Sequence, residues 1–292
     1  MRKFKFHSLE YVLLRIIEKF LVILPRPVAL FLGQSIGFIL YLFKIYRKVV
    51  LKNMEYVGLW EKREMDKIIF NLYLNIGRYA VDFLRSPAHI PPYTIHNYEI
   101  VDPLFAQNRG IIVLLAHFGN WELLAEIFGK TIPNLSVVAK PMRNSKVDNW
   151  LAEKRKKTAV TTIYVDQALR KMLESIKRNG MVAILIDQDP GKHGTMVKFL
   201  GKDANTVRTV AGIVHKTGCA VLPTYAILRK DNSYDVIIEK ADPVSHEGKT
   251  DEEIIAAYQL QHNEIISEWI QKNPEHWFGW FHKRFKATLK YK

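Results

Sequence analysis

The chain has 292 residues and a mass of 34.0 kDa, and 48% of its residues are hydrophobic, which excludes a disordered tail, a mini-protein and a low-complexity polymer. The formal net charge of +14 favours an anionic partner, such as nucleic acid, phospholipid headgroups or an acidic protein. The only cysteine is Cys219, so the composition excludes intrachain disulfides and cysteine-rich zinc sites and allows a reducing compartment.

The N-terminal part, residues 1–53, is unusually apolar and has basic residues at both ends. No charge interrupts the run from Pro27 to Phe43. As a helix this run would be about 25 Å long, slightly less than the hydrocarbon core of a bilayer, which is about 30 Å thick. A single span is therefore marginal, whereas an interfacial hairpin turned at Pro25 to Pro27 suits the basic flanks. We expect a membrane anchor over residues 1–53, and a buried helical hairpin is the alternative.

The next element is an amphipathic helix, predicted over Lys62 to Arg85, where apolar residues recur every three or four positions. From Tyr98 onward, short β-branched runs alternate with helices that begin at Asn or Asp and end near Gly. This alternation predicts an α/β fold, a mixed sheet covered by helices, within one domain of residues 54–292. We expect strands at 111–115, 135–139, 182–186, 220–227 and 234–239, and helices at 120–128, 166–179, 206–217 and 251–272.

The strongest chemical signal is the segment AHFGNWE, residues 116–122. His117 follows the apolar run 111–115, which would deliver it to the carboxyl edge of a buried strand, where open α/β sheets bind ligands. Glu122 lies in the first turn of the next helix. A carboxylate there can fix the imidazole tautomer and stabilise its charged form, so that His117 removes a proton from a substrate hydroxyl. The alternative is a histidine in a turn beside an unrelated helix-start glutamate.

No serine or cysteine accompanies His117 in this loop. Direct attack by the activated hydroxyl is therefore favoured over a covalent acyl-enzyme intermediate.

AHFGNWE resembles the H-x4-D/E motif of the lysophospholipid acyltransferase superfamily, in particular its branch of bacterial lipid A biosynthesis (late, lauroyl or myristoyl) acyltransferases. The likeness extends over nearly the whole chain, the apolar N-terminus included, and implies a glycerolipid acyltransferase-like α/β fold. Further segments resemble motifs of that branch in the same order, namely Lys140-Pro141 with Asn144, Arg155, Asp187-Gln188-Asp189, Pro223 and the closing PEHWFGWFHKRFK of residues 274–286.

The resemblance implies an O-acyltransferase. In it His117 would be the general base and Glu122 would orient and charge His117. Arg155, Lys140 or backbone N–H groups would stabilise the oxyanion or bind phosphate. The donor would be an acyl carrier protein thioester and the acceptor a Kdo-modified lipid A precursor at the cytoplasmic face of the bacterial inner membrane, with neither metal nor organic cofactor. Substrate contacts would come from Lys140, Asn144, Asp187, Gln188, Asp189, His282 and Arg284.

Other interpretations of the same residues stay open at this point. A glycolipid or lysophospholipid acyltransferase using acyl-CoA would share His117 and Glu122. A hydrolase using the His and Asp groups would release fatty acid or phosphate without an acceptor. A non-enzymatic protein would bind membranes or nucleic acid, although the chain contains no glycine-rich phosphate loop. Asp187 and Asp189 could bind a cation or cap a turn. The closing segment 274–286 could be core packing, or could place basic groups on acceptor phosphates.

Overall fold

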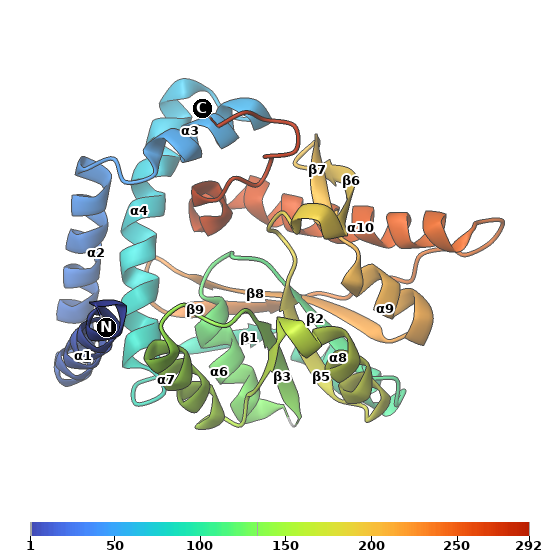
Figure 1. The fold of residues 1–292 in the computed structure, drawn as a ribbon, viewed down its shortest axis with the longest axis horizontal. Coiled ribbons are helices and arrows are strands. Elements are labelled where there is room, and N and C mark those ends of the chain that lie inside the picture. The colour runs from blue at the N-terminus through green and yellow to red at the C-terminus, as the bar shows by residue number, and fades with distance from the viewer. Residues whose placement is uncertain (1, 133, 292) are drawn as a thin grey trace.

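The fold is built on a mixed sheet of seven strands. The computed structural model describes residues 2–132 and 134–291 and gives the strand order β1-β9-β8-β2-β5-β3-β4 (Figure 1). Strands β8 and β9 pair antiparallel, whereas the other neighbouring strands pair in parallel. The bounds are β1 Tyr93–His96, β2 Ile111–Leu115, β3 Leu135–Ala139, β4 Thr161–Tyr164, β5 Met181–Leu185, β8 Ala220–Leu228 and β9 Tyr234–Ile238.

The pairing of β2 with β5 determines what lies at the edge of the sheet. Every residue of β2 is buried, as expected for a central parallel strand covered on both faces. Leu115 lies opposite Leu185 at the carboxyl ends of the two strands. The residues two positions beyond, His117 and Asp187, therefore leave the sheet side by side.

Helices cover the sheet, and the sequence predicted two of them with their observed bounds. The helix α4 spans Lys62–Arg85, and α10 spans Asp251–Lys272, where Thr250 and Glu253 form the expected capping box. The other helices of residues 47–292 are α3 Arg47–Val57, α5 Val101–Ala106, α6 Trp121–Thr131, α7 Ser145–Lys156, α8 Ala168–Lys177 and α9 Thr209–Thr217. Short 3-10 turns lie at Tyr98–Ile100, Val165–Gln167, Gly191–His193, Pro274–His276 and Phe278–Phe281.

The prediction of one helix over residues 206–217 is wrong at its start. The strand β7, Lys202–Val207, pairs antiparallel with β6, Gly194–Phe199, in a separate hairpin, and α9 begins only at Thr209. The tight turn of this hairpin uses Gly201 at φ +75°, a left-handed conformation that favours glycine. Thr206 ends up fully buried at this hairpin, so tertiary packing overrides the local helix signal.

Two further helices have bounds that differ from the predicted ones. The helix α6 runs through Gly129 to Thr131, because this glycine does not cap the helix but lets it approach another segment: a Cβ there would lie 2.1 Å from the carbonyl oxygen of Thr158. The predicted helix 166–179 is shorter, beginning as a 3-10 turn before α8 starts at Ala168.

The helix break predicted at Pro25 is present, but the helix before it packs against α4 and α7 rather than along the helix after it, so the two do not form the expected hairpin. The helix α1 spans Arg2–Ile23, α2 spans Arg26–Leu42, and α2 packs along α4 (Figure 1). Within the described residues no single helix has the length and apolar character to cross a membrane; only α2 taken together with α3, across a bend of 80°, passes that test. The membrane anchor therefore stays a prediction.

Both N-terminal helices nevertheless expose many large apolar side chains. An apolar face of this extent is uncommon on a monomeric soluble protein. Its residues, called here the N-terminal apolar face, are Phe6, Leu9, Val12, Leu13, Ile16, Ile17, Phe20 and Ile23 of α1, and Val28, Phe31, Ile36, Phe38, Ile39 and Leu42 of α2.

A close backbone approach of α2 to α4 yields the first prediction. A Cβ at Gly77 would lie only 1.9 Å from the carbonyl oxygen of Gly33. Although alanine is the better helix former, Gly77→Ala should lower the free energy of unfolding by about 1–3 kcal/mol through overpacking. Urea-induced unfolding followed by circular dichroism measures this.

Gly212→Ala provides the control. Gly212 lies in α9, and a Cβ added there would meet no atom of the described residues within 4 Å. Alanine at this position should therefore raise the free energy of unfolding by about 0.4–1 kcal/mol. Equal effects of the two substitutions would show that the contact between α2 and α4 does not depend on glycine.

Candidate active site

The loop after β2 is fastened to the closing segment by backbone hydrogen bonds. Phe278 N donates to His117 O over 2.7 Å, and Gly119 N donates to His276 O over 2.8 Å. Gly119 adopts φ +64°, and a Cβ there would lie 1.9 Å from Ala226 O of β8. The loop thus fits between β8 and the closing segment only with glycine at this position.

The carboxylate that holds the His117 ring belongs to Asp187. Its Oδ1 lies 2.8 Å from His117 Nδ1, and its Oδ2 accepts from His117 N at 2.9 Å and from Trp277 Nε1 at 2.7 Å. The Asp187 side chain is fully buried. Three donors around one buried carboxylate fix both its position and the orientation of the imidazole, so that His117 Nε2 points away from Asp187 and toward Gln188.

These contacts shift the pKa values of both groups toward their charged forms. Burial would raise the pKa of Asp187, but the charge and hydrogen bonds of His117 and the Trp277 indole lower it to about 2. Burial would lower the pKa of His117, but Asp187 outweighs it and raises the pKa, with a further contribution from Glu122. The ionised Asp187 therefore makes His117 a stronger base.

The predicted contact between His117 and Glu122 takes a different form. Glu122 is engaged by Arg155, whose Nη2 and Nε lie 2.7 Å and 3.2 Å from its two carboxylate oxygens. Glu122 therefore influences His117 through charge, while Asp187 makes the hydrogen bond that was expected of Glu122. The reason is the strand order: β5 lies beside β2 and places Asp187 level with His117.

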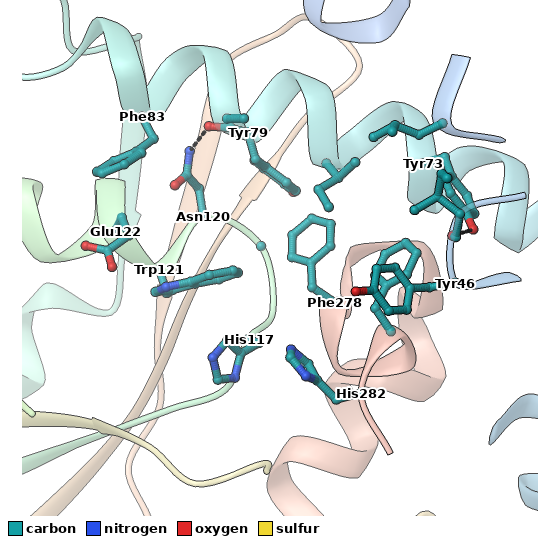
Figure 2. A pocket seen from close by; sticks show the side chains of 16 residues that line it. Tyr46, Tyr73, Tyr79, Phe83, His117, Asn120, Trp121, Glu122, Phe278 and His282 are labelled. Atoms are coloured by element: carbon teal, nitrogen blue, oxygen red, sulfur yellow. Dashed lines mark hydrogen bonds between the residues drawn. The ribbon is translucent and has the colours of Figure 1, made fainter. Parts of the chain in front are cut away.

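His117 and Glu122 line a cavity of about 560 Å³, within the range of about 300–1,000 Å³ typical of ligand pockets. Figure 2 shows α4 along one side of it, with His117 and His282 on the opposite side. The wall is largely apolar and aromatic. Its residues are Leu40, Ile45, Tyr46, Tyr73, Ile76, Tyr79, Ala80, Phe83, His117, Gly119, Asn120, Trp121, Glu122, Phe278, Phe281 and His282.

Two further predicted residues lie beside the His117 ring. His282 lies with its ring centroid 5.9 Å from that of His117, and Gln188 Nε2 lies 3.3 Å from His117 Nε2. Partial burial and the neighbouring His117 lower the pKa of His282, so its imidazole is neutral at neutral pH. Both side chains are exposed enough to meet a substrate.

The other residues predicted to contact the substrate either form contacts within the protein or lie away from the His117 ring. Asn144 is buried: its Oδ1 caps α7, and its Nδ2 donates to His7 O and Glu10 of α1. Arg284 is buried too, donates to Asn205 O and stacks over Phe199, so a phosphate contact is unsupported.

Asp189 and Lys140 also stand apart from the His117 ring. Asp189 accepts from Gly191 N and from Asn205 of β7, and lies 3.5 Å from Lys286 of the closing segment, so it joins its own loop to these two segments. Lys140 is exposed after β3, at the same edge of the sheet as His117. In the described parts of the chain, no group of three His, Cys, Asp or Glu side chains is arranged to hold a metal ion.

Some residues of the site were not predicted from the sequence. The closing segment was expected to form core packing or a phosphate contact, yet its Trp277 indole donates a hydrogen bond to Asp187. Trp121 lies edge-on to His117 with ring centroids 5.0 Å apart. Tyr79 and Phe83 bring α4 into the cavity wall. A signal for the last two existed in the apolar periodicity of α4, but periodicity marks a buried face without saying what it faces.

Comparison with known proteins identifies the family. The sequence profile of the family described as bacterial lipid A biosynthesis acyltransferase matches residues 2–287. The chain belongs to this family. It is 26% identical over 274 residues to the lipid A biosynthesis palmitoleoyltransferase of Escherichia coli (strain K12), covering 90% of this chain and 87% of that protein.

Two further relatives have related names. Over 274 residues the chain is 26% identical to the lipid A biosynthesis acyltransferase of Shigella flexneri, covering 90% of this chain and 87% of that protein. Over 273 residues it is 24% identical to the lipid A biosynthesis lauroyltransferase of Escherichia coli (strain K12), with the same coverage. The protein is therefore an acyltransferase, and its family supports acyl transfer to lipid A.

The hydrogen bond between Asp187 and His117 yields the second prediction. With neutral His117 as the base that the sequence predicts, the rate of acyl transfer should rise with pH, and the midpoint of this rise should lie above the ordinary histidine pKa of 6.5. Asp187→Asn removes the charge that raises this pKa, so the midpoint should move to lower pH. The rate should also fall by about a hundredfold or more, because the amide favours the wrong tautomer. A pH profile of kcat measures both effects.

Asp189→Asn is the matched control, since Asp189 lies two residues away but contacts Gly191, Asn205 and Lys286 and does not contribute to the pKa shift of His117. This variant should keep the midpoint of the wild type. A midpoint that stays in place in Asp187→Asn as well would contradict the assignment of Asp187 as the partner of His117.

Proposed function

We propose that this acyltransferase moves a fatty acyl group from an acyl carrier protein thioester to a hydroxyl of a lipid A precursor, at the cytoplasmic face of the bacterial inner membrane. The observation that carries the proposal is an activated histidine in the wall of a large apolar cavity. A base of this kind suits deprotonation of an acceptor hydroxyl, and the cavity suits a hydrocarbon chain.

The proposed reaction starts at His117 Nε2. It takes the proton of the acceptor hydroxyl as the oxygen attacks the thioester carbonyl, and the resulting imidazolium is stabilised by Asp187 through the 2.8 Å hydrogen bond and by the charge of Glu122. When the tetrahedral intermediate collapses, the carbon–sulfur bond breaks and the thiolate leaves, and His117 returns the proton to sulfur. The products are an ester and a free thiol.

Stabilisation of the oxyanion is assigned to the donors nearest the free face of His117. Gln188 Nε2 and the neutral His282 imidazole flank this face, so both can donate to the carbonyl oxygen as its charge develops. Arg155 is assigned a supporting role: its two-point contact keeps Glu122 oriented at the rim of the cavity.

Membrane association is supported by the N-terminal apolar face. These side chains cover α1 and α2, and α2 contributes Leu40 to the cavity wall. A lipid acceptor in a bilayer would therefore reach the cavity beside the helices that dip into the same bilayer. The net charge of +14 suits an acidic carrier protein on the aqueous side.

The third prediction tests the reaction. Purified protein in detergent is given radiolabelled acyl carrier protein thioester and a tetra-acylated Kdo-lipid A precursor. The wild type should move the label to the lipid, and His117→Ala should lose transfer by more than about a hundredfold, because the base is gone. His246→Ala, at an exposed histidine lining a different cavity, should transfer like the wild type.

Each alternative outcome has a defined meaning. Transfer by His117→Ala at the wild-type rate would contradict the mechanism. Transfer by the wild type from acyl-CoA but not from the carrier protein would make the donor assignment wrong. Release of free fatty acid in the absence of acceptor would indicate a hydrolase.

The fourth prediction tests whether the cavity holds the acyl chain. Ile76 projects from α4 into the cavity wall. Ile76→Trp should fill part of the volume and shift donor preference toward shorter acyl chains, lowering kcat/KM for the longest accepted chain by about tenfold or more. Competition between donors of different chain length measures this.

Leu169→Trp serves as the control, because Leu169 is 56% exposed on α8 and does not line the cavity. It should leave chain-length preference unchanged. A uniform loss across all chain lengths in Ile76→Trp would mean that the chain lies elsewhere.

A further inference from the structure

A second ion pair lies beside the one between Glu122 and Arg155, and it is buried. Lys154 Nζ lies 3.1 Å from Glu126 Oε1, and the two side chains are only 3% and 1% exposed. Glu126 follows Glu122 by about one turn of α6, and Lys154 directly precedes Arg155 in α7. Two cations of α7 therefore meet two carboxylates on successive turns of α6, so the helices are joined at two points.

Lys154 also joins these helices to the end of α4. Its ammonium group donates to Ser86 O and, over 3.0 Å, to Ser86 Oγ. It lies 4.8 Å from the centroid of the Phe83 ring, within the range of a cation–π contact. Phe83 lines the cavity that holds His117, and Figure 2 shows it at the same end as Glu122. Lys154 is not among the residues that line this cavity, so it reaches the site only through its neighbours.

The charges of the buried pair act on Glu122 as well. Burial lowers the pKa of Lys154, and Glu126 opposes this shift, with a smaller contribution from Glu122. Burial raises the pKa of Glu126, which Lys154 partly offsets, while the charge of Glu122 adds to the rise. Glu122 in turn contributes to the raised pKa of His117. Glu122 therefore lies electrostatically between the buried pair and the catalytic base.

Stability alone is a weak reason for a buried ion pair. Taking two charges out of water costs about as much free energy as their attraction returns, so apolar side chains of similar volume often hold a fold equally well. Charges with directed contacts can instead specify one arrangement of the helices that carry them. Here that arrangement sets where Arg155 meets Glu122, over 2.7 Å and 3.2 Å.

We propose that Glu126 and Lys154 are positioning residues, which hold Arg155 against Glu122 and so keep the Glu122 charge in place near His117. This inference rests on the proposed function, since Glu122 stabilises the His117 imidazolium in that mechanism. The alternative is a pair that only stabilises the fold, and the experiment separates the two roles.

The test compares two variants of the full-length chain. Lys154→Met leaves Glu126 buried without its cation and should lower the unfolding temperature by about 5 °C or more. Lys154→Met/Glu126→Leu removes both charges and should return the unfolding temperature to within about 4 °C of the wild type. Both variants should nevertheless have kcat lowered about tenfold or more with KM unchanged, because the charge that they misplace acts on the transition state.

The double variant decides between the two roles. Recovery of the wild-type kcat together with the unfolding temperature would overturn the proposal, since the pair would then serve only the fold. Should leucine not fit at this position, Lys154→Met/Glu126→Gln keeps the shape of the Glu126 side chain and is judged by the same criterion.

A second comparison asks whether the pair acts through Arg155. Arg155→Gln should lower kcat by itself, and adding Lys154→Met/Glu126→Leu should lower it little further, because both changes interrupt one route to Glu122. Losses that multiply would show that the pair acts independently of Arg155 and would overturn the proposal.

Arg208→Gln/Glu252→Gln is the control. It removes an exposed ion pair, 2.7 Å long, between the residue before α9 and the first turn of α10. This variant should keep the kcat of the wild type. An equal loss of kcat in the control would show that removing any ion pair slows the enzyme, and the inference would fail.

The last measurement does not depend on acyl transfer. Arg155 Nε donates to Glu122, so nuclear magnetic resonance should show its Nε–H proton exchanging slowly with water in the wild type. In Lys154→Met/Glu126→Leu this exchange should be faster by about tenfold or more. Unchanged exchange would overturn the inference. Faster exchange in the variant, with no acyl transfer by the wild type, would retain the inference and refute only the proposed reaction.

Discussion

A buried carboxylate holds the active site together. An ionised Asp187 is costly inside a protein unless donors surround it. Here they come from the loop after β2 and from the closing segment, through His117 and Trp277. Two parts of the sequence that lie far apart are thereby fixed to the end of β5. The same contacts that offset the cost of burial also set the base strength of His117, so in the proposed mechanism the fold of the site and its catalysis both depend on Asp187.

Much of the framework could be predicted from residue patterns, because local signals determine it. The helices α4 and α10 and the strand β2 have their predicted bounds, since periodicity, capping residues and a continuous apolar run are properties of neighbouring residues. The hairpin β6–β7 was not predicted because the sequence of β7 is polar and contains threonine, without a clear strand pattern. This strand forms through its pairing with β6.

The sequence indicated which residues lie near His117, but not which of them forms a hydrogen bond with it. His117, Glu122, Gln188 and His282 do come together, whereas the partner of His117 is Asp187. Spacing along the chain shows that Glu122 is near, but it carries no information on which strand lies beside β2. That information is set by the sheet order, a tertiary property. Asn144 and Arg284 illustrate the same limit, since a motif gives a residue's position and not its partners.

The contacts between α1 and α7 bear on how the protein can be handled. Asn144 at the start of α7 donates to His7 O and Glu10, and Trp150 of the same helix donates to Glu18. Arg155, which forms the two-point contact with Glu122, lies about one and a half turns beyond Trp150 in α7. Cutting away the first helix to make the protein easier to purify would therefore expose the underside of the helix that supports Glu122. A truncated protein, even a more soluble one, would therefore lack the support of α7 that the whole chain has.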